Sequence, residues 1–162
     1  MTDKELLKKV TNLLKKQKLT IATAESCTGG LIAHTLTNIS GSSNYFDRGI
    51  VSYSNRAKME LLDIPEVLFK KHGAVSPEVA EAMAEGVRIK SNVDIGIATT
   101  GIAGPTGGTK EKPVGLVYIA VSTSDKTEVK KFQFLGDRLQ NKESTCIEAL
   151  QMILNILTIQ HK

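Results

Sequence analysis

The order in which helix-like and strand-like segments follow one another constrains the fold of this chain most strongly. Apolar residues recur every three or four positions between residues 4 and 16, which predicts an amphipathic helix. The apolar segment 19–24 then predicts a strand, which runs into Ser26. The turn that follows opens a second predicted helix, ending near residue 38.

The rest of the chain continues this alternation. The further predicted elements are a strand over 45–54, a helix carrying Lys58 and Leu61, a helix starting at Ser76-Pro77-Glu78, a strand over 94–100, a hairpin formed by 114–122 and 128–135, and a closing helix that includes 147–157. This order predicts a three-layer α/β/α sandwich with a central mixed sheet of about five strands. No repeat or linker is visible, so we expect one domain spanning residues 1–162.

Length and composition indicate a soluble globular class of protein. The chain has 162 residues, of which 41% are hydrophobic and 23% are charged. No apolar run is long enough to cross a bilayer, and the first residues form a charged helical pattern rather than a signal peptide. We therefore expect a cytoplasmic protein with no membrane partner.

The cysteines and histidines lack the spacing of a disulfide framework or a metal site. Cys27 and Cys146 are far apart, and His34, His72 and His161 are scattered. We expect both thiols to be reduced, and we expect neither a metal nor a cofactor.

The net charge of +4 raises the question of nucleic-acid binding. Much of the excess is lysine on the first predicted helix and its exit, which favours a solvated helix face. The chain has no tryptophan and only 4% aromatic residues, so stacking surfaces for single strands are scarce. We expect a small anionic ligand rather than nucleic acid.

A hydroxyl, a phenol and an amine lie close together in the first third of the chain: Ser26, Tyr53 and Lys58. A serine becomes a useful nucleophile when a nearby base takes its proton, and a lysine of lowered pKa can be that base. Lowering a lysine pKa by about three pH units requires roughly 4 kcal/mol from its environment. The three residues could build a hydrolase that needs neither histidine nor metal, with Tyr53 relaying or orienting the proton.

Each of these residues also has a structural interpretation. Ser26 could cap a helix or hold a phosphate, Tyr53 could pack on the core, and Lys58 could be solvated. Cys27, beside the serine, is more typical of buried packing than of a nucleophile.

The glycine-rich loop over 100–109 could be a plain connection or a concave nest of backbone N–H groups for an anion. Arg48 and Arg138 could bind a phosphate bidentately or form ordinary surface or interface ion pairs. All three features remain candidates for substrate binding.

Six segments in sequence order resemble the CinA C-terminal domain family, which includes nicotinamide-nucleotide amidases. They are Glu25-Ser26-Cys27-Thr28-Gly29-Gly30, Gly41-Ser42-Ser43-Asn44-Tyr45-Phe46, Gly49-Ile50-Val51-Ser52-Tyr53-Ser54-Asn55, Gly73-Ala74-Val75-Ser76, Thr100-Gly101-Ile102-Ala103-Gly104-Pro105 and Lys112-Pro113-Val114-Gly115. The resemblance extends from about residue 4 to 158. It implies an α/β/α domain that converts nicotinamide mononucleotide to nicotinate mononucleotide and ammonia without a cofactor.

By position, the family's catalytic serine, tyrosine and lysine fall on Ser26, Tyr53 and Lys58. With the resemblance in view, the residues expected to bind the pyridine nucleotide are Thr28, Gly29, Gly30, Arg48, Thr100, Gly101, Gly104 and Arg138. In many relatives this domain follows an N-terminal molybdopterin-binding-like domain, which the sequence here does not include. We therefore expect it to resemble the stand-alone, amidase-type members of the family. We also expect a homo-oligomer.

One position departs from the family pattern. Asn141 and Lys142 stand where the family often has an aliphatic residue and then an arginine, and lysine lacks the forked donors of a guanidinium. The alternative function is a non-catalytic module that binds a nucleotide or a partner protein and is linked to competence or DNA damage.

Overall fold

A five-stranded sheet forms the middle layer of the computed structural model, which describes residues 1–159. Its strands are β1 (Ile21–Glu25), β2 (Phe46–Val51), β3 (Ile95–Gly101), β4 (Leu116–Ser122) and β5 (Thr127–Gln133). The strand order is β2-β1-β3-β4-β5, with β2, β1 and β3 parallel and with β4 and β5 antiparallel to their neighbours. The predicted mixed sheet and the predicted hairpin are confirmed.

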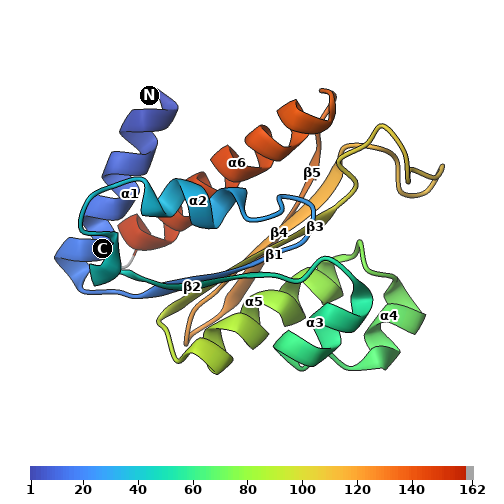
Figure 1. Ribbon diagram of the computed structural model, residues 1–162, viewed down its shortest axis with the longest axis horizontal. Helices are drawn as coiled ribbons and strands as arrows, with labels where there is room; N and C mark the ends of the chain where they lie inside the picture. The colour runs from blue at the N-terminus through green and yellow to red at the C-terminus, as the bar shows by residue number, and fades with distance from the viewer. Residues whose placement is uncertain (160–162) are drawn as a thin grey trace.

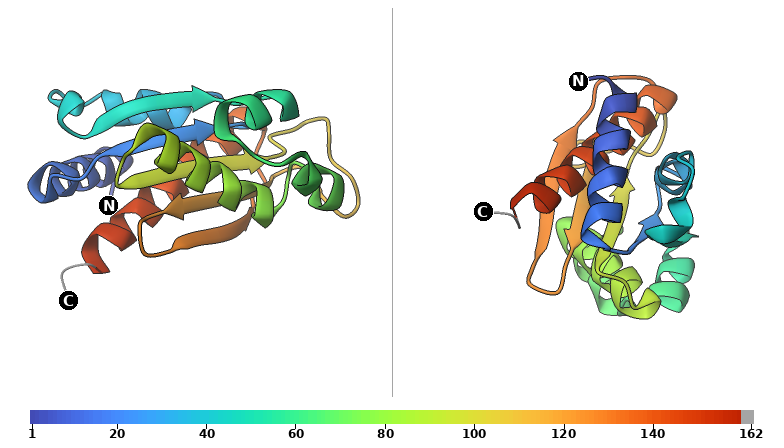
Figure 2. Two further views of the ribbon diagram at one scale, coloured as in Figure 1. Left: turned by 90° about the horizontal axis from the view of Figure 1, so that it is seen from below. Right: turned by 90° about the vertical axis from the view of Figure 1, so that its left-hand side faces the viewer.

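Helices cover both faces of this sheet, as Figures 1 and 2 show. The helices are α1 (Asp3–Gln17), α2 (Leu31–Thr37), α3 (Asn55–Leu62), α4 (Glu66–His72), α5 (Pro77–Ser91) and α6 (Arg138–Ile159), with a short 3₁₀ helix over Ser42–Asn44. In Figure 1, α1, α2 and α6 lie on one side of the sheet, and α3, α4 and α5 lie on the other. The chain is therefore the three-layer α/β/α sandwich that its sequence predicts.

The two cores differ in the size of their sheet residues. Towards α1 and α6 the sheet presents large aliphatic side chains such as Ile97 and Ile119. Towards α5 it presents alanines, among them Ala22, Ala98 and Ala120. Small side chains let a helix approach a sheet closely, and the 15-residue α5 packs against β1, β3, β4 and β5.

Helix starts follow the capping signals in the sequence. The Ser76 hydroxyl accepts a hydrogen bond from the Val79 N–H, and Pro77 occupies the first turn of α5. The second helix begins later than the sequence predicts, at Leu31 instead of residue 28. Gly29 and Gly30 adopt φ angles of 61° and 100°, outside the helical region, and the chain stays a loop until they are passed.

The fold brings the carboxyl ends of the parallel strands to one edge of the sheet, where α/β proteins commonly bind ligands. The loop over 102–115 and the start of α6 lie at this same edge (Figure 1). No helix within residues 1–159 is long and apolar enough to cross a membrane.

Candidate active site

Three hydroxyl side chains line up across the carboxyl ends of β2, β1 and β3. The Ser52 N–H donates to the Glu25 carbonyl at 2.9 Å, and the Ser26 N–H donates to the Thr99 carbonyl at 3.1 Å. These bonds extend the parallel pairing by one residue, so Ser26 lies between Ser52 and Thr100. Because side chains alternate along a strand, all three face the layer of α3 to α5.

Ser26 begins the loop that leads to α2 and is 8% exposed. Its hydroxyl makes no hydrogen bond to any residue of the described chain. The serine is therefore not the helix cap that its position also allowed, because α2 starts after Gly30 without a side-chain cap.

The Glu25 carboxylate organises this loop, although the sequence reasoning did not single it out. It is 1% exposed, and it accepts hydrogen bonds from the Ile32 and Ala33 N–H groups at 2.9 and 3.0 Å. The hydroxyls of Thr28 and Thr23 donate to it as well, at 2.6 and 3.3 Å. The carboxylate thus occupies two amides at the start of α2.

Thr28 was expected to contact the substrate. Its buried hydroxyl donates to Glu25, and its oxygen lies 2.8 Å from that of Thr99. The hydroxyl is therefore committed to holding the loop. A signal for Glu25 did exist in the sequence, since an acidic residue at the end of a buried strand needs several donors.

Lys58 is a buried amine on α3, with 1% of its surface exposed. Its Nζ donates to the backbone carbonyl of Tyr53 at 3.0 Å and forms no salt bridge within residues 1–159. Burial lowers the pKa of this amine, while the nearby Cys27 acts weakly in the opposite direction. The burial excludes the solvated interpretation of Lys58.

Cys27 does not compete with Ser26 as a nucleophile. Burial raises the pKa of its thiol to about 11, despite an opposing hydrogen bond with Thr99 and the opposing charge of Lys58. The thiolate is the reactive form, so the thiol is inert at neutral pH. Cys27 instead packs in the core under α1 and α6.

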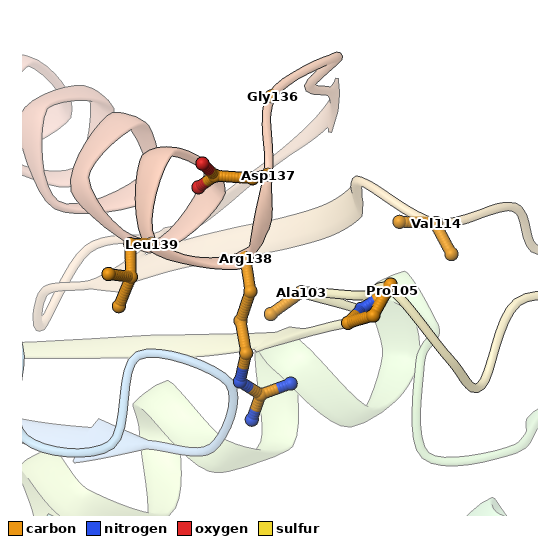
Figure 3. Close-up of a pocket in the computed structure, with 7 residues that line it drawn as sticks. All are labelled: Ala103, Pro105, Val114, Gly136, Asp137, Arg138 and Leu139. Carbon is orange, nitrogen blue, oxygen red and sulfur yellow. The ribbon is translucent and has the colours of Figure 1, made fainter.

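Tyr53 presents its phenol to the solvent side of the site and is 59% exposed, which excludes a core position. Its oxygen accepts a hydrogen bond from Nη2 of Arg138 at 3.1 Å. Nη1 of Arg138 donates to the Gly104 carbonyl at 2.8 Å. Arg138 therefore joins three of the predicted site residues, while its side chain points away from Asp137 (Figure 3).

A cavity of about 410 Å³ adjoins Arg138. It lies between the start of α6 and the loop after β3, and Figure 3 shows its lining residues Ala103, Pro105, Val114, Gly136, Asp137, Arg138 and Leu139. Ser26 and Lys58 do not line it. Its volume is in the range of small-ligand sites.

The remaining predicted residues separate into those at this edge and one away from it. The Thr100 hydroxyl donates to the Ala74 carbonyl at 2.8 Å, and Gly101 leaves no room for a side chain beside Val117. Arg48 pairs with Asp47 on the exposed edge strand β2 and lies about four strand residues from the site, or roughly 13 Å.

Asn141 and Lys142, which depart from the family pattern, both face the site. Asn141 is buried, donates to the Ala103 carbonyl at 3.0 Å and accepts from the Gly136 N–H at 3.0 Å. The Lys142 Nζ lies 3.6 Å from the position that a Cβ atom on Gly29 would occupy. Within residues 1–159, no cluster of three or more His, Cys, Asp or Glu side chains could hold a metal ion.

Comparison with known proteins places this architecture in one family. The family model of the CinA C-terminal domain matches residues 3–157. A CinA-like protein of Syntrophus aciditrophicus is 52% identical over 156 residues, covering 96% of this chain and 37% of its own length. A CinA-like protein of Desulfotalea psychrophila is 54% identical over 144 residues, covering 89% of this chain and 35% of its own. The chain thus spans little more than a third of these relatives.

Solved structures agree over nearly the whole chain. The competence/damage-inducible protein CihA of Agrobacterium tumefaciens has a TM-score of 0.92 and 39% identity, covering 96% of this chain and 97% of its own. A CinA superfamily protein of Klebsiella pneumoniae has a TM-score of 0.93 and 30% identity, covering 98% and 99%. From the family match and these relatives, the chain belongs to the CinA C-terminal domain family.

Proposed function

We propose that this domain is an amidohydrolase that converts nicotinamide mononucleotide to nicotinate mononucleotide and ammonia. The observation that carries the proposal is the buried Lys58 amine, which no carboxylate neutralises among the described residues. A lysine in such a place holds its proton weakly, as a general base requires. The Ser26 hydroxyl, which lies at the neighbouring strand end and has no partner within the described residues, is the nucleophile.

The reaction has two halves. Neutral Lys58 accepts the proton that Ser26 loses as its Oγ bonds to the carboxamide carbon. The tetrahedral intermediate collapses, the C–N bond breaks, and the proton returns from Lys58 to the departing nitrogen, which leaves as ammonia. Water then attacks the Ser26 ester and gives a proton to Lys58. The ester C–O bond breaks as Lys58 passes that proton to the Ser26 Oγ, and the carboxylic acid product loses its own proton to solvent.

The oxyanion of the intermediate needs donors already in place. In our proposal these are backbone N–H groups of the loop 27–30. Glu25 keeps that loop rigid by binding the hydroxyl of Thr28 and the first amides of α2. The first amides of α2 are already bonded, that of Leu31 to the Thr28 carbonyl and those of Ile32 and Ala33 to the Glu25 carboxylate.

We assign the phosphate and ribose of the nucleotide to the cavity beside Arg138. Arg138 is held by the Gly104 carbonyl and bonds the Tyr53 phenol, so its guanidinium is oriented before substrate arrives. Lys142 adds a second positive charge next to Gly29. The Tyr53 phenol, which is hydrogen-bonded to Arg138, would contact the nucleotide in this arrangement.

The test is the release of ammonia and nicotinate mononucleotide from nicotinamide mononucleotide by the purified protein. We expect Ser26→Ala to reduce kcat by about 1,000-fold or more, because it removes the nucleophile. Ser43→Ala is the matched control, since Ser43 is an exposed serine outside the site.

Two results would contradict the proposal. One is full activity in Ser26→Ala protein, which would mean that water attacks directly. The other is tight binding of the nucleotide by wild-type protein with no ammonia released, which would instead support a non-catalytic binding module.

A further inference from the structure

We propose that the Ser52 hydroxyl carries the proton between Ser26 and Lys58, an inference that rests on the proposed amidase function. Ser52 directly follows β2 and is 0% exposed. Its Oγ has no hydrogen-bond partner within residues 1–159. A buried hydroxyl without a partner costs stability.

Ser52 lies next to Ser26, where its unpaired hydroxyl can take part in proton transfer. It lies one strand from Ser26, and adjacent strands are about 4.8 Å apart. On the other side of Ser26, the Thr100 hydroxyl already donates to the Ala74 carbonyl. Of the two hydroxyls that flank the nucleophile, only that of Ser52 is free to exchange a proton with it.

Lys58 approaches the same strand end. Its Nζ bonds the backbone carbonyl of Tyr53, the residue directly after Ser52, and both the amine and the Ser52 hydroxyl are buried. The Tyr53 phenol is exposed and bonded to Arg138 instead. The Ser52 hydroxyl is therefore buried at the same strand end as the Lys58 amine, whereas the Tyr53 phenol is exposed.

The relay needs no additional reactant. As the Ser26 Oγ bonds to the carboxamide carbon, its proton moves to the Ser52 Oγ while the proton of Ser52 moves to the Lys58 Nζ. When the C–N bond breaks, the Lys58 Nζ returns a proton to the Ser52 Oγ while the proton of Ser52 moves to the departing nitrogen, which leaves as ammonia. Such hydrogen bonds are often long without substrate and tighten in the complex.

Ser52→Ala separates this role from a structural one. We expect kcat for nicotinamide mononucleotide to fall about 100-fold with little change in KM, because a proton-transfer group is lost while binding is kept. We expect the melting temperature to stay at or above that of the wild type, since an unpaired hydroxyl has been removed. Ser52→Thr, which keeps a hydroxyl, is expected to recover most of the activity.

Ser91 supplies a matched control. It is the other buried serine whose Oγ has no partner in the described chain, and it ends α5 at the opposite edge of the sheet. Ser91→Ala is expected to leave kcat unchanged. Wild-type activity in Ser52→Ala, a loss expressed in KM alone, or a loss that Ser52→Thr does not recover would overturn the relay.

A second readout does not depend on the nucleotide. Phenylmethanesulfonyl fluoride reacts with activated serines, and mass spectrometry of peptides measures its addition to Ser26. We expect Ser52→Ala to slow this labelling about as much as it slows turnover, and Ser91→Ala to leave it unchanged. Labelling that is slowed by Tyr53→Phe but not by Ser52→Ala would overturn the relay, as would a wild-type Ser26 that is never labelled. If the wild type is labelled but releases no ammonia, the proposed substrate alone is wrong.

Discussion

The two ends of the parallel strands differ in how completely their polar side chains are hydrogen-bonded. At the amino end, the N–H and the hydroxyl of Thr20 both donate to one carboxylate oxygen of Asp94, at 2.7 and 2.9 Å. The Asp94 N–H donates back to the Thr20 hydroxyl at 3.2 Å. At the carboxyl end, the buried Ser52 hydroxyl has no partner within residues 1–159, and the amine of Lys58 is buried.

This difference separates stability from chemistry. At the amino end, the Thr20–Asp94 pair closes its hydrogen bonds on itself, which stabilises the fold. The carboxyl end keeps reactive groups unpaired at a cost in stability, as active sites commonly do. Substitution of the reactive groups at the carboxyl end should therefore lower activity without a loss of stability, and substitution of the Thr20–Asp94 pair should do the reverse.

The largest expected effect at the carboxyl end is that of Lys58→Met. Loss of the general base should lower kcat by about 1,000-fold. The same substitution should stabilise the protein at neutral pH by roughly 1 kcal/mol or more, because a buried ammonium without a carboxylate partner is replaced by an apolar side chain. Activity assays and urea unfolding at pH 7 measure the two changes.

The pH dependence of stability gives the sign of the Lys58 contribution. Burial lowers the pKa of Lys58 below its unfolded value of about 10.4. The burial penalty is fully present below the lowered pKa and fades as the pH rises towards the unfolded value, because the unfolded state then binds more protons. The free energy of unfolding of the wild type should therefore rise as the pH increases from the lowered pKa of Lys58 towards its unfolded value. The Lys58→Met protein should not show this rise. Lys71→Met, at an exposed lysine of α4, should change neither property.

Glu25→Gln should have the next largest effect, because it disrupts the loop that carries the nucleophile. A glutamine side chain has one oxygen, so its NH₂ group would face donors that the second carboxylate oxygen now serves, including the Ala33 N–H. We expect a loss of about 2–3 kcal/mol in the free energy of unfolding, together with lower kcat. Urea unfolding and ammonia release measure both.

Glu85→Gln is the matched control for this prediction. The Glu85 carboxylate accepts one described side-chain hydrogen bond, from the Thr127 hydroxyl at 2.8 Å, and is only partly buried. Its substitution should cost less than about 1 kcal/mol. If both variants lost the same stability, the network around Glu25 would have no special role in holding the loop.

The sequence predicted the layers of this fold because its periodicities are strong. The predicted helices at 4–16 and from Ser76, and the strand at 94–100, are all confirmed within a few residues. The separate helix α4 was missed, since Pro65 and the short segment Glu66–His72 give too few turns for a periodic signal. The late start of α2 was missed because the positive φ angles of Gly29 and Gly30, which precede it, cannot be read from the sequence.

The site was only partly predictable. The sequence singled out Ser26, Tyr53 and Lys58, and the structure adds that Lys58 meets the backbone carbonyl of Tyr53 while Arg138 meets its phenol. Glu25 was not singled out, although an acidic residue at the end of a buried strand was a signal for it. Ser52 was not singled out because its importance depends on burial and strand register. No local pattern reveals that a hydroxyl lacks a partner.

Asp94→Ala, at the amino end, should have the smallest effect and completes the comparison. It removes the acceptor of two Thr20 hydrogen bonds, but the released groups are exposed and can bond to water. The expected loss is therefore about 1 kcal/mol in the free energy of unfolding, with kcat and KM for nicotinamide mononucleotide unchanged. Thr20→Ala and the double variant would measure the coupling of the pair. A fall in kcat with any of these substitutions would mean that the two strand ends are not independent, because β1 and β3 would then transmit the disturbance from one end to Ser26 at the other.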